Sequence, residues 1–240
     1  MEAKNKIVKA KVKLQKDNPF FAYLVMNLEF HEDEKIDSIG VDLKGNCFYN
    51  PKWIEEQDDD KLKGVLAHEV LHLALEHLQR ENDRDRTTFN ISADLVINNI
   101  LVNSNFDLPK GLIPHNDSFQ LPNGKWIEDL DKKTAEQVYN EIDKPNNKNQ
   151  IGSMDDERFD KHIKADKETN KAKVIADSKD KWKKAFTEAS VYAKQQGKLP
   201  SGMDRLLDIV LNEKVSWKVL LYKYLTRTLP YDYTYSRPSK

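Results

Sequence analysis

The chain has 240 residues, 38% of them hydrophobic and 33% charged, so it is long enough to bury a core as one domain. Lys and Arg (39) nearly balance Asp and Glu (40), which argues against the basic field of a nucleic-acid-binding protein. No apolar run approaches the roughly 20 residues that span a bilayer, no signal peptide is evident, and the single Cys47 excludes an intramolecular disulfide. We therefore expect a cytoplasmic protein with neither a nucleic-acid nor a membrane partner.

The N-terminal third predicts two helices followed by a hairpin. Residues 2–16 alternate lysines with apolar residues and favour a helix with a solvated face, and Asn18-Pro19 begins a second short helix from Phe20 to Leu28. Residues 38–42 and 46–50 read as two strands joined by a glycine-containing turn. We expect the chain to leave the sheet at Pro51-Lys52-Trp53-Ile54.

The next predicted helix begins at an acidic first turn, Asp58-Asp59-Asp60, and carries the sequence His-Glu-x-x-His at residues 68–72. His68 and His72 are four residues apart, so a helix places both imidazoles on one face, where they can bind one Zn²⁺. Glu69 lies one step round the helix, close enough to take a proton from a metal-bound water.

The residues around this motif distinguish a metal site from a chance match. Both flanks of the histidine stripe are apolar: Leu62, Leu66, Val70 and Leu73 on one side, and Ala67, Leu71, Ala74, Leu75 and Leu78 on the other. A helix that is apolar on nearly all sides belongs in a core, and buried polar groups need a partner. We favour a metal as that partner; the alternative is a hydrogen-bonded pair of core histidines.

A second apolar helix, from Phe89 to Leu101, follows a charged loop and carries a polar stripe at Asn90, Asp94 and Asn98. Buried carboxylates are rare unless they are paired or bind a metal. Asp94 is therefore the predicted third ligand, and Asn98 or Asn90 is expected to orient it from outside the ligand shell.

Two alternatives to a ligand role for Asp94 remain open. Asp94 could cap its helix or pair with Arg80 or Arg84. His77, five residues after the second motif histidine, is a rival ligand, because metzincins place their third histidine six residues after the second, beyond a glycine. No glycine interrupts the sequence here, so on a continuing helix His77 points roughly 140° away from the metal-binding edge. We expect His77 to pack or to act outside the ligand shell.

The second half of the chain predicts mainly helices. Thr134 to Ile142 begins with a capping-box pattern. We divide the chain into a metal-binding core (1–143), a charged linker with a mobile helical segment (144–181) and C-terminal helices that pack back on the core (182–240), within one domain overall. The C-terminal helices are expected at 182–195, 203–211 and 217–229. The predicted fold class is α+β, mostly helical, with a small hairpin sheet packed on the buried motif helix.

Several motifs together resemble a metallopeptidase domain family of bacteria and phages. They are Pro19-Phe20-Phe21, the hairpin from Gly40 to Pro51, His68 to His72, Asn90 with Ala93 to Asn98, Leu108-Pro109, Ser216-Trp217 with Leu220-Leu221, and Ser236-Arg237-Pro238. The resemblance implies a zincin-like fold with His68, His72 and Asp94 near the metal. In this family the domain often precedes a von Willebrand factor A-like domain, so that domain or a partner protein is an expected neighbour.

The chain departs from the family pattern in two places. Where the family often has Asp-Asp-His-x-x-Trp, this sequence reads Phe159-Asp160-Lys161-His162, with Asp166 at the tryptophan position. No Asp-x-Ser-x-Ser motif of a von Willebrand factor A-like domain occurs in the 240 residues.

The leading hypothesis from the sequence is a zinc metallopeptidase, a hydrolase that cleaves a peptide or protein substrate. Zn²⁺ held by His68, His72 and Asp94 keeps a fourth position for water, and Glu69 is the general base. The alternative is a non-catalytic, zinc-stabilised interaction module. The oxyanion-stabilising residue is left open among His115, His162, Tyr139, Tyr222 and Tyr224.

Overall fold

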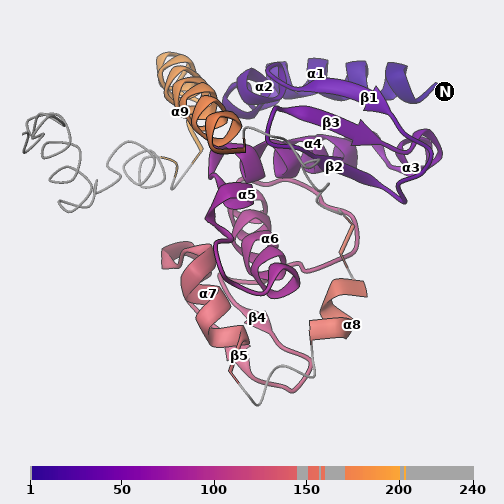
Figure 1. The fold of residues 1–240 in the computed structure, drawn as a ribbon. Helices are drawn as coiled ribbons and strands as arrows, with labels where there is room; N and C mark the ends of the chain where they lie inside the picture. The colour runs from indigo at the N-terminus through magenta and orange to yellow at the C-terminus, as the bar shows by residue number, and fades with distance from the viewer. Residues whose placement is uncertain (1, 145–150, 157, 160–170, 201–202, 204–240) are drawn as a thin grey trace, which may run out of the picture.

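The computed structural model describes residues 2–144, 151–156, 158–159, 171–200 and 203, and these residues form an α+β fold that is mostly helical (Figure 1). The helices are α1 (Ala3–Asp17), α2 (Pro19–Val25), α3 (Pro51–Glu56), α4 (Asp59–Ala74), α5 (His77–Arg80), α6 (Arg86–Asn103), α7 (Ala135–Ile142), α8 (Ile151–Asp156) and α9 (Lys171–Gln195), with a 3-10 turn η1 (Leu130–Lys132). The strands are β1 (Glu29–Glu32), β2 (Ile39–Val41), β3 (Asn46–Tyr49), β4 (Phe119–Gln120) and β5 (Trp126–Ile127).

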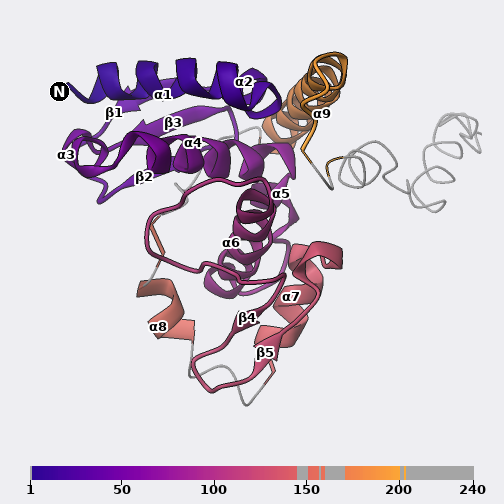
Figure 2. The same ribbon diagram turned by 180° about the vertical axis from the view of Figure 1, so that it is seen from behind.

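The N-terminal part is a three-stranded sheet backed by helices. The strand order is β1-β3-β2; β2 pairs antiparallel with β3, so Val41 lies opposite Cys47, and β1 pairs parallel with β3. Figure 2 shows α1 and α4 side by side with the sheet behind them. The predicted hairpin and the first two helices are confirmed.

Two elements of this layer were not predicted from the sequence. The side chains of strand β1 do not alternate between buried and exposed, so no hydrophobic periodicity indicates a strand. Its partner β3 is 14 residues or more away along the chain, so no tight turn indicates the pairing either. The chain leaves the sheet at Pro51 as expected, but it does so as helix α3: the Asn50 side chain accepts hydrogen bonds from the Lys52 and Trp53 amides, and Pro51 occupies the first helical position.

The motif helix ends earlier than we expected. The prediction of a helix continuing through Arg80 was wrong: α4 ends at Ala74, and Glu76 adopts a left-handed conformation (φ 59°, ψ 27°) before α5 begins. Such a residue at a helix end is usually glycine, and its absence misled the prediction. Side-chain contacts support this turn instead: Arg80 donates to the Leu75 carbonyl (2.9 Å) within the turn, and Lys179 from α9 approaches Glu76 (3.6 Å).

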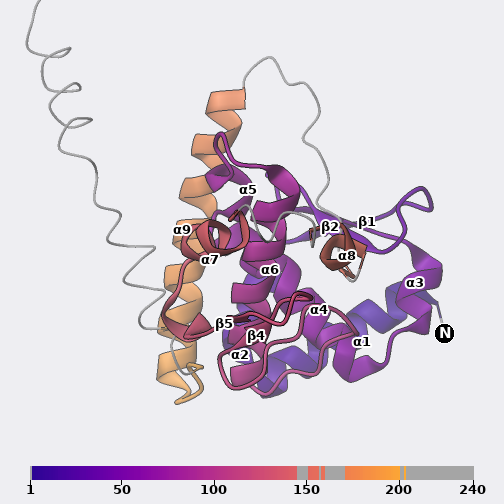
Figure 3. The ribbon, with the colours of Figure 1, turned by 90° about the horizontal axis from the view of Figure 1, so that it is seen from below.

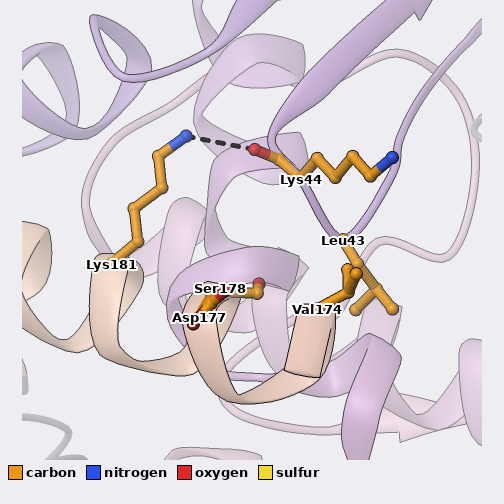
Figure 4. Close-up of a pocket in the computed structure, with 6 residues that line it drawn as sticks. All are labelled: Leu43, Lys44, Val174, Asp177, Ser178 and Lys181. Atoms are coloured by element: carbon orange, nitrogen blue, oxygen red, sulfur yellow. Dashed lines mark hydrogen bonds between the residues drawn. The ribbon is translucent and has the colours of Figure 1, made fainter. Parts of the chain in front are cut away.

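The second half of the fold is built around α6. This helix packs on α4 and α7, and α9 packs on α2 and α4. Figure 3 shows α8 and α9 on opposite sides of α6, as does Figure 1. A pocket of about 250 Å³ lies where α9 meets the β2–β3 turn; there the Lys181 ammonium donates to the Lys44 carbonyl at 3.1 Å (Figure 4).

Helix α9 runs without interruption from 171 to 195, so the expected boundary at residue 181 falls inside it; the division of the chain into three segments stays a prediction. The predicted helices 203–211 and 217–229 lie outside the described residues, except for Met203, which is buried. Within the described part of the chain, no helix is both long and apolar enough to cross a membrane.

Gly64 allows a loop to approach α4 on the face that carries the motif histidines, one turn before His68. A Cβ atom at this position would lie 2.2 Å from the Asp107 carbonyl oxygen and 2.9 Å from the Leu108 side chain. Atoms that close overlap, so the loop after α6 packs against bare helix backbone here.

We expect Gly64→Ala to destabilise the protein by about 1–3 kcal/mol, because the cost of overlap with a backbone carbonyl exceeds the gain in helix propensity of up to about 1 kcal/mol. Gly152→Ala in α8 is the matched control, since nothing lies within 4 Å of its Cβ position. Urea unfolding of both variants measures the difference, and a Gly64→Ala protein as stable as the wild type would contradict the close approach.

Candidate metal centre

Helices α4 and α6 bring the three predicted ligands together. His68 and His72 come from α4 and Asp94 from α6, and one donor atom of each lies within 4.8 Å of the others, so these residues could hold a metal ion. The two Nε2 atoms are 3.0 Å apart. Asp94 Oδ1 lies 3.2 Å from Nε2 of His72 and 3.8 Å from Nε2 of His68.

The cluster is closed off from solvent. His68, Glu69 and His72 are 0% exposed and Asp94 is 2% exposed. The pocket in Figure 4 is lined by residues of the β2–β3 turn and α9 and includes none of these four. Burying a carboxylate is costly unless it is compensated, so the surroundings of Asp94 decide whether the cluster is stable.

Asn98 fixes the ring of His68. Its Nδ2 donates to the Leu112 carbonyl (2.9 Å), which settles the orientation of the amide, and its Oδ1 lies 2.9 Å from His68 Nδ1. A carbonyl oxygen only accepts, so Nδ1 of His68 carries the proton and Nε2 presents its lone pair to the cluster.

The expectation that Asn98 or Asn90 orients Asp94 needs correction. Both hydrogen bonds of the Asn98 side chain go elsewhere, to His68 and Leu112. Asn90 is half-buried and makes no side-chain hydrogen bond in the described part of the chain. Asn98 therefore orients His68 on the neighbouring helix α4, and not Asp94 on its own helix as we expected.

An arginine that the sequence did not reveal contacts Asp94. Arg158 Nε donates to Asp94 Oδ2 at 2.5 Å. The alternative pairing of Asp94 with Arg80 or Arg84 is wrong, because Arg80 forms a two-pronged pair with Glu136 and Arg84 lies over aromatic rings. Arg158 is 64 residues from Asp94 along the chain, and no local pattern connects them.

Phe159, the next residue, packs against another of the predicted ligands, His68. Its ring centroid lies 4.7 Å from that of His68, with the planes inclined by 58°. Two adjacent residues shortly after α8 thus contact one predicted ligand each: Arg158 pairs with Asp94, and Phe159 packs on His68.

His77 lies closer to the cluster than we expected. Because α4 ends at Ala74, the chain turns and brings the His77 ring to 5.4 Å from the His72 ring, nearly perpendicular to it (75°). It is buried and also faces Phe89, but it is not one of the three converging donors. A supporting role for His77 stays a prediction.

Comparison with known proteins agrees with the motif. Residues 2–240 match the family model described as "Putative metallopeptidase domain". The chain belongs to this metallopeptidase domain family. It is also 23% identical over 255 residues to an uncharacterized protein of Thermotoga maritima, with 97% of this chain aligned. The chain spans 61% of the length of that relative. No solved structure matched. A von Willebrand factor A-like neighbour stays a prediction.

The predicted oxyanion-stabilising residues of this metallopeptidase-family chain lie elsewhere or outside the described residues. His115 is exposed and sits in a bridge with Ser118, and the Tyr139 hydroxyl accepts from the Asp85 amide (3.1 Å). Neither contacts the three converging donors within the described part of the chain. His162, Tyr222 and Tyr224 fall outside the described residues.

Cys47 lies on β3 beneath the motif helix. Burial raises the pKa of its thiol well above the ordinary value, and the negative charge of Glu69 raises this pKa further. Among the described residues, Cys47 is not one of the donors that converge at the candidate centre.

We expect Cys47 to resist alkylation in the native protein at pH 8, because the thiol is buried and its raised pKa leaves almost no thiolate at that pH. Mass spectrometry after iodoacetamide treatment should show no adduct in buffer and one adduct in guanidinium chloride. Labelling at similar rates in the two solutions would contradict the burial of Cys47 in the core.

Proposed function

We propose that this protein is a zinc-dependent metallopeptidase with a zincin-like centre. The observation that carries the proposal is the convergence of His68, His72 and Asp94 on one point in the core, with Glu69 beside them on α4. Membership of the metallopeptidase domain family supports it. The proposed substrate is a peptide or protein.

The donor atoms fit zinc. Nitrogen and oxygen ligands lie about 2.0–2.1 Å from Zn²⁺, and in a tetrahedron such ligands are separated by about 3.3 Å. The observed separations of 3.0, 3.2 and 3.8 Å bracket this value. Two imidazoles and one carboxylate also match the donor set of catalytic zinc sites, which leave one position open. His68 already has the tautomer that a ligand needs.

The chemistry follows from the division of roles among these side chains. Bound zinc would supply a Lewis acid that polarises the scissile carbonyl and acidifies water. Glu69 would accept a proton from the attacking water and return it to the departing amine nitrogen. Its burial keeps competing solvent away from this proton transfer. Asp94 would offset part of the metal charge.

A non-catalytic, zinc-stabilised interaction module is the second candidate, and one observation favours it. All four central side chains are at most 2% exposed, and Arg158 and Phe159 cover the cluster, so an extended peptide cannot reach it without a movement of the chain. Glu69 favours the enzyme, because a structural site needs no general base and usually closes with a fourth protein ligand.

We expect the purified protein to bind about one Zn²⁺ per chain, as elemental analysis would measure. Asp94→Ala should weaken zinc binding by orders of magnitude through loss of a direct ligand. His77→Ala should weaken it at most ~10–100-fold, the range for residues outside the ligand shell. Chelator competition ranks the two variants. The reverse ranking would replace Asp94 by His77 as third ligand, and no zinc uptake at all would remove the proposal.

Glu69→Gln separates the enzyme from the structural module. The substitution keeps the size of the side chain but removes its basicity, so zinc content and melting temperature should stay near those of the wild type while peptide cleavage is lost. Cleavage of a broad peptide library by the zinc-loaded proteins is the measurement. Equal cleavage by wild type and variant would exclude Glu69 as the base.

A further inference from the structure

We propose that Arg158 is a positioning residue that holds Asp94 in the orientation needed to bind the metal. This inference rests on the metal-binding part of the proposed function. It concerns a residue that lies outside the His-Glu-x-x-His motif and outside both helices of the centre.

The two oxygens of Asp94 have separate surroundings. Oδ1 faces the imidazoles, 3.2 Å from His72 Nε2, whereas Oδ2 accepts the hydrogen bond from Arg158 Nε at 2.5 Å. With Oδ2 held in this way, the carboxylate presents one oxygen to the point where the two histidines meet. Hydrogen bonds of this kind orient metal-binding carboxylates and are nearly as important as the ligands themselves.

Arg158 is itself held from two sides. Its side chain is only 6% exposed, and its Nη1 lies 3.2 Å from Asp155 Oδ1 in the last turn of α8. Asp155 is 47% exposed, so the two ion pairs of Arg158 connect the surface of α8 with the buried Asp94. The adjoining Phe159 is fixed against His68, which limits the freedom of the Arg158 backbone.

Arg158 also compensates the negative charge of Asp94 in the core. Asp94 comes from a helix whose buried residues are otherwise neutral, and a lone buried carboxylate is costly. Pairing with the guanidinium places a positive charge beside Asp94 Oδ2 and leaves Oδ1 facing the imidazoles. The ion pair therefore prepares the site for binding rather than only filling space.

The test measures metal affinity, not only activity. We expect Arg158→Gln to weaken Zn²⁺ binding ~10–100-fold in chelator competition and to change the visible absorption of the Co²⁺-loaded protein, because Asp94 loses its fixed orientation. Arg158→Lys retains a positively charged donor and should recover part of the affinity. Lys133→Gln is the control: it removes another partly buried cation–carboxylate pair, with Glu141, that contacts none of the three ligands, so affinity should stay near the wild-type value.

A double-mutant cycle tests whether Arg158 acts through Asp94. In the Asp94→Ala background, Arg158→Gln should produce no further loss of zinc affinity, measured with a weaker chelator. The double variant also avoids leaving a single buried charge, so it keeps the test valid if Arg158→Gln alone folds poorly.

The outcomes separate this inference from the proposed function. A wild-type protein that binds neither Zn²⁺ nor Co²⁺ removes the metal centre itself. If the wild type binds metal, unchanged or tighter binding by Arg158→Gln overturns the role of Arg158 alone. So does an equal loss in Lys133→Gln, or the same factor lost again in the Asp94→Ala background.

Discussion

The hydrogen bond between His68 and Asn98 joins the two buried helices on which the centre depends. It ties α4 to α6 at 2.9 Å, and the other end of the Asn98 amide ties both helices to the Leu112 carbonyl in the loop after α6. That loop reaches the helices because Gly64 lets Asp107 approach the backbone of α4. One amide thus sets the spacing of the helices and the tautomer of a candidate ligand.

Residues on regular helices could be predicted from the sequence, whereas residues reached through loops could not. His68, His72 and Asp94 meet because two apolar helices each carry a polar stripe, and such stripes are visible in the periodicity. Arg158 lies beyond the last residue of α8, in a segment rich in charges of both signs. Nothing in its local sequence distinguishes an arginine that pairs with a buried carboxylate from one in water.

The errors near the motif have the same origin. Helix α4 ends at Ala74 through contacts that Arg80 and Lys179 make across the turn, and helix periodicity cannot register contacts of that kind. The early end then moves His77 from the far side of the helix to the neighbourhood of His72. A single backbone angle at Glu76 therefore decides whether a histidine near the motif lies beside the centre or on the opposite flank.

The charges of the buried groups connect the closed centre to its proposed chemistry. Glu69 and Asp94 bring two carboxyl groups into the core, and Arg158 pairs with Asp94. Taking an ion out of water costs several kcal/mol even after relaxation, so a second buried carboxylate is retained only where it is compensated or has a use. Glu69 is not one of the three converging donors, but it is buried next to His68 on α4. A structural centre needs no general base at this position, whereas the proposed enzyme uses Glu69 to accept a proton, which favours the enzyme over the structural module.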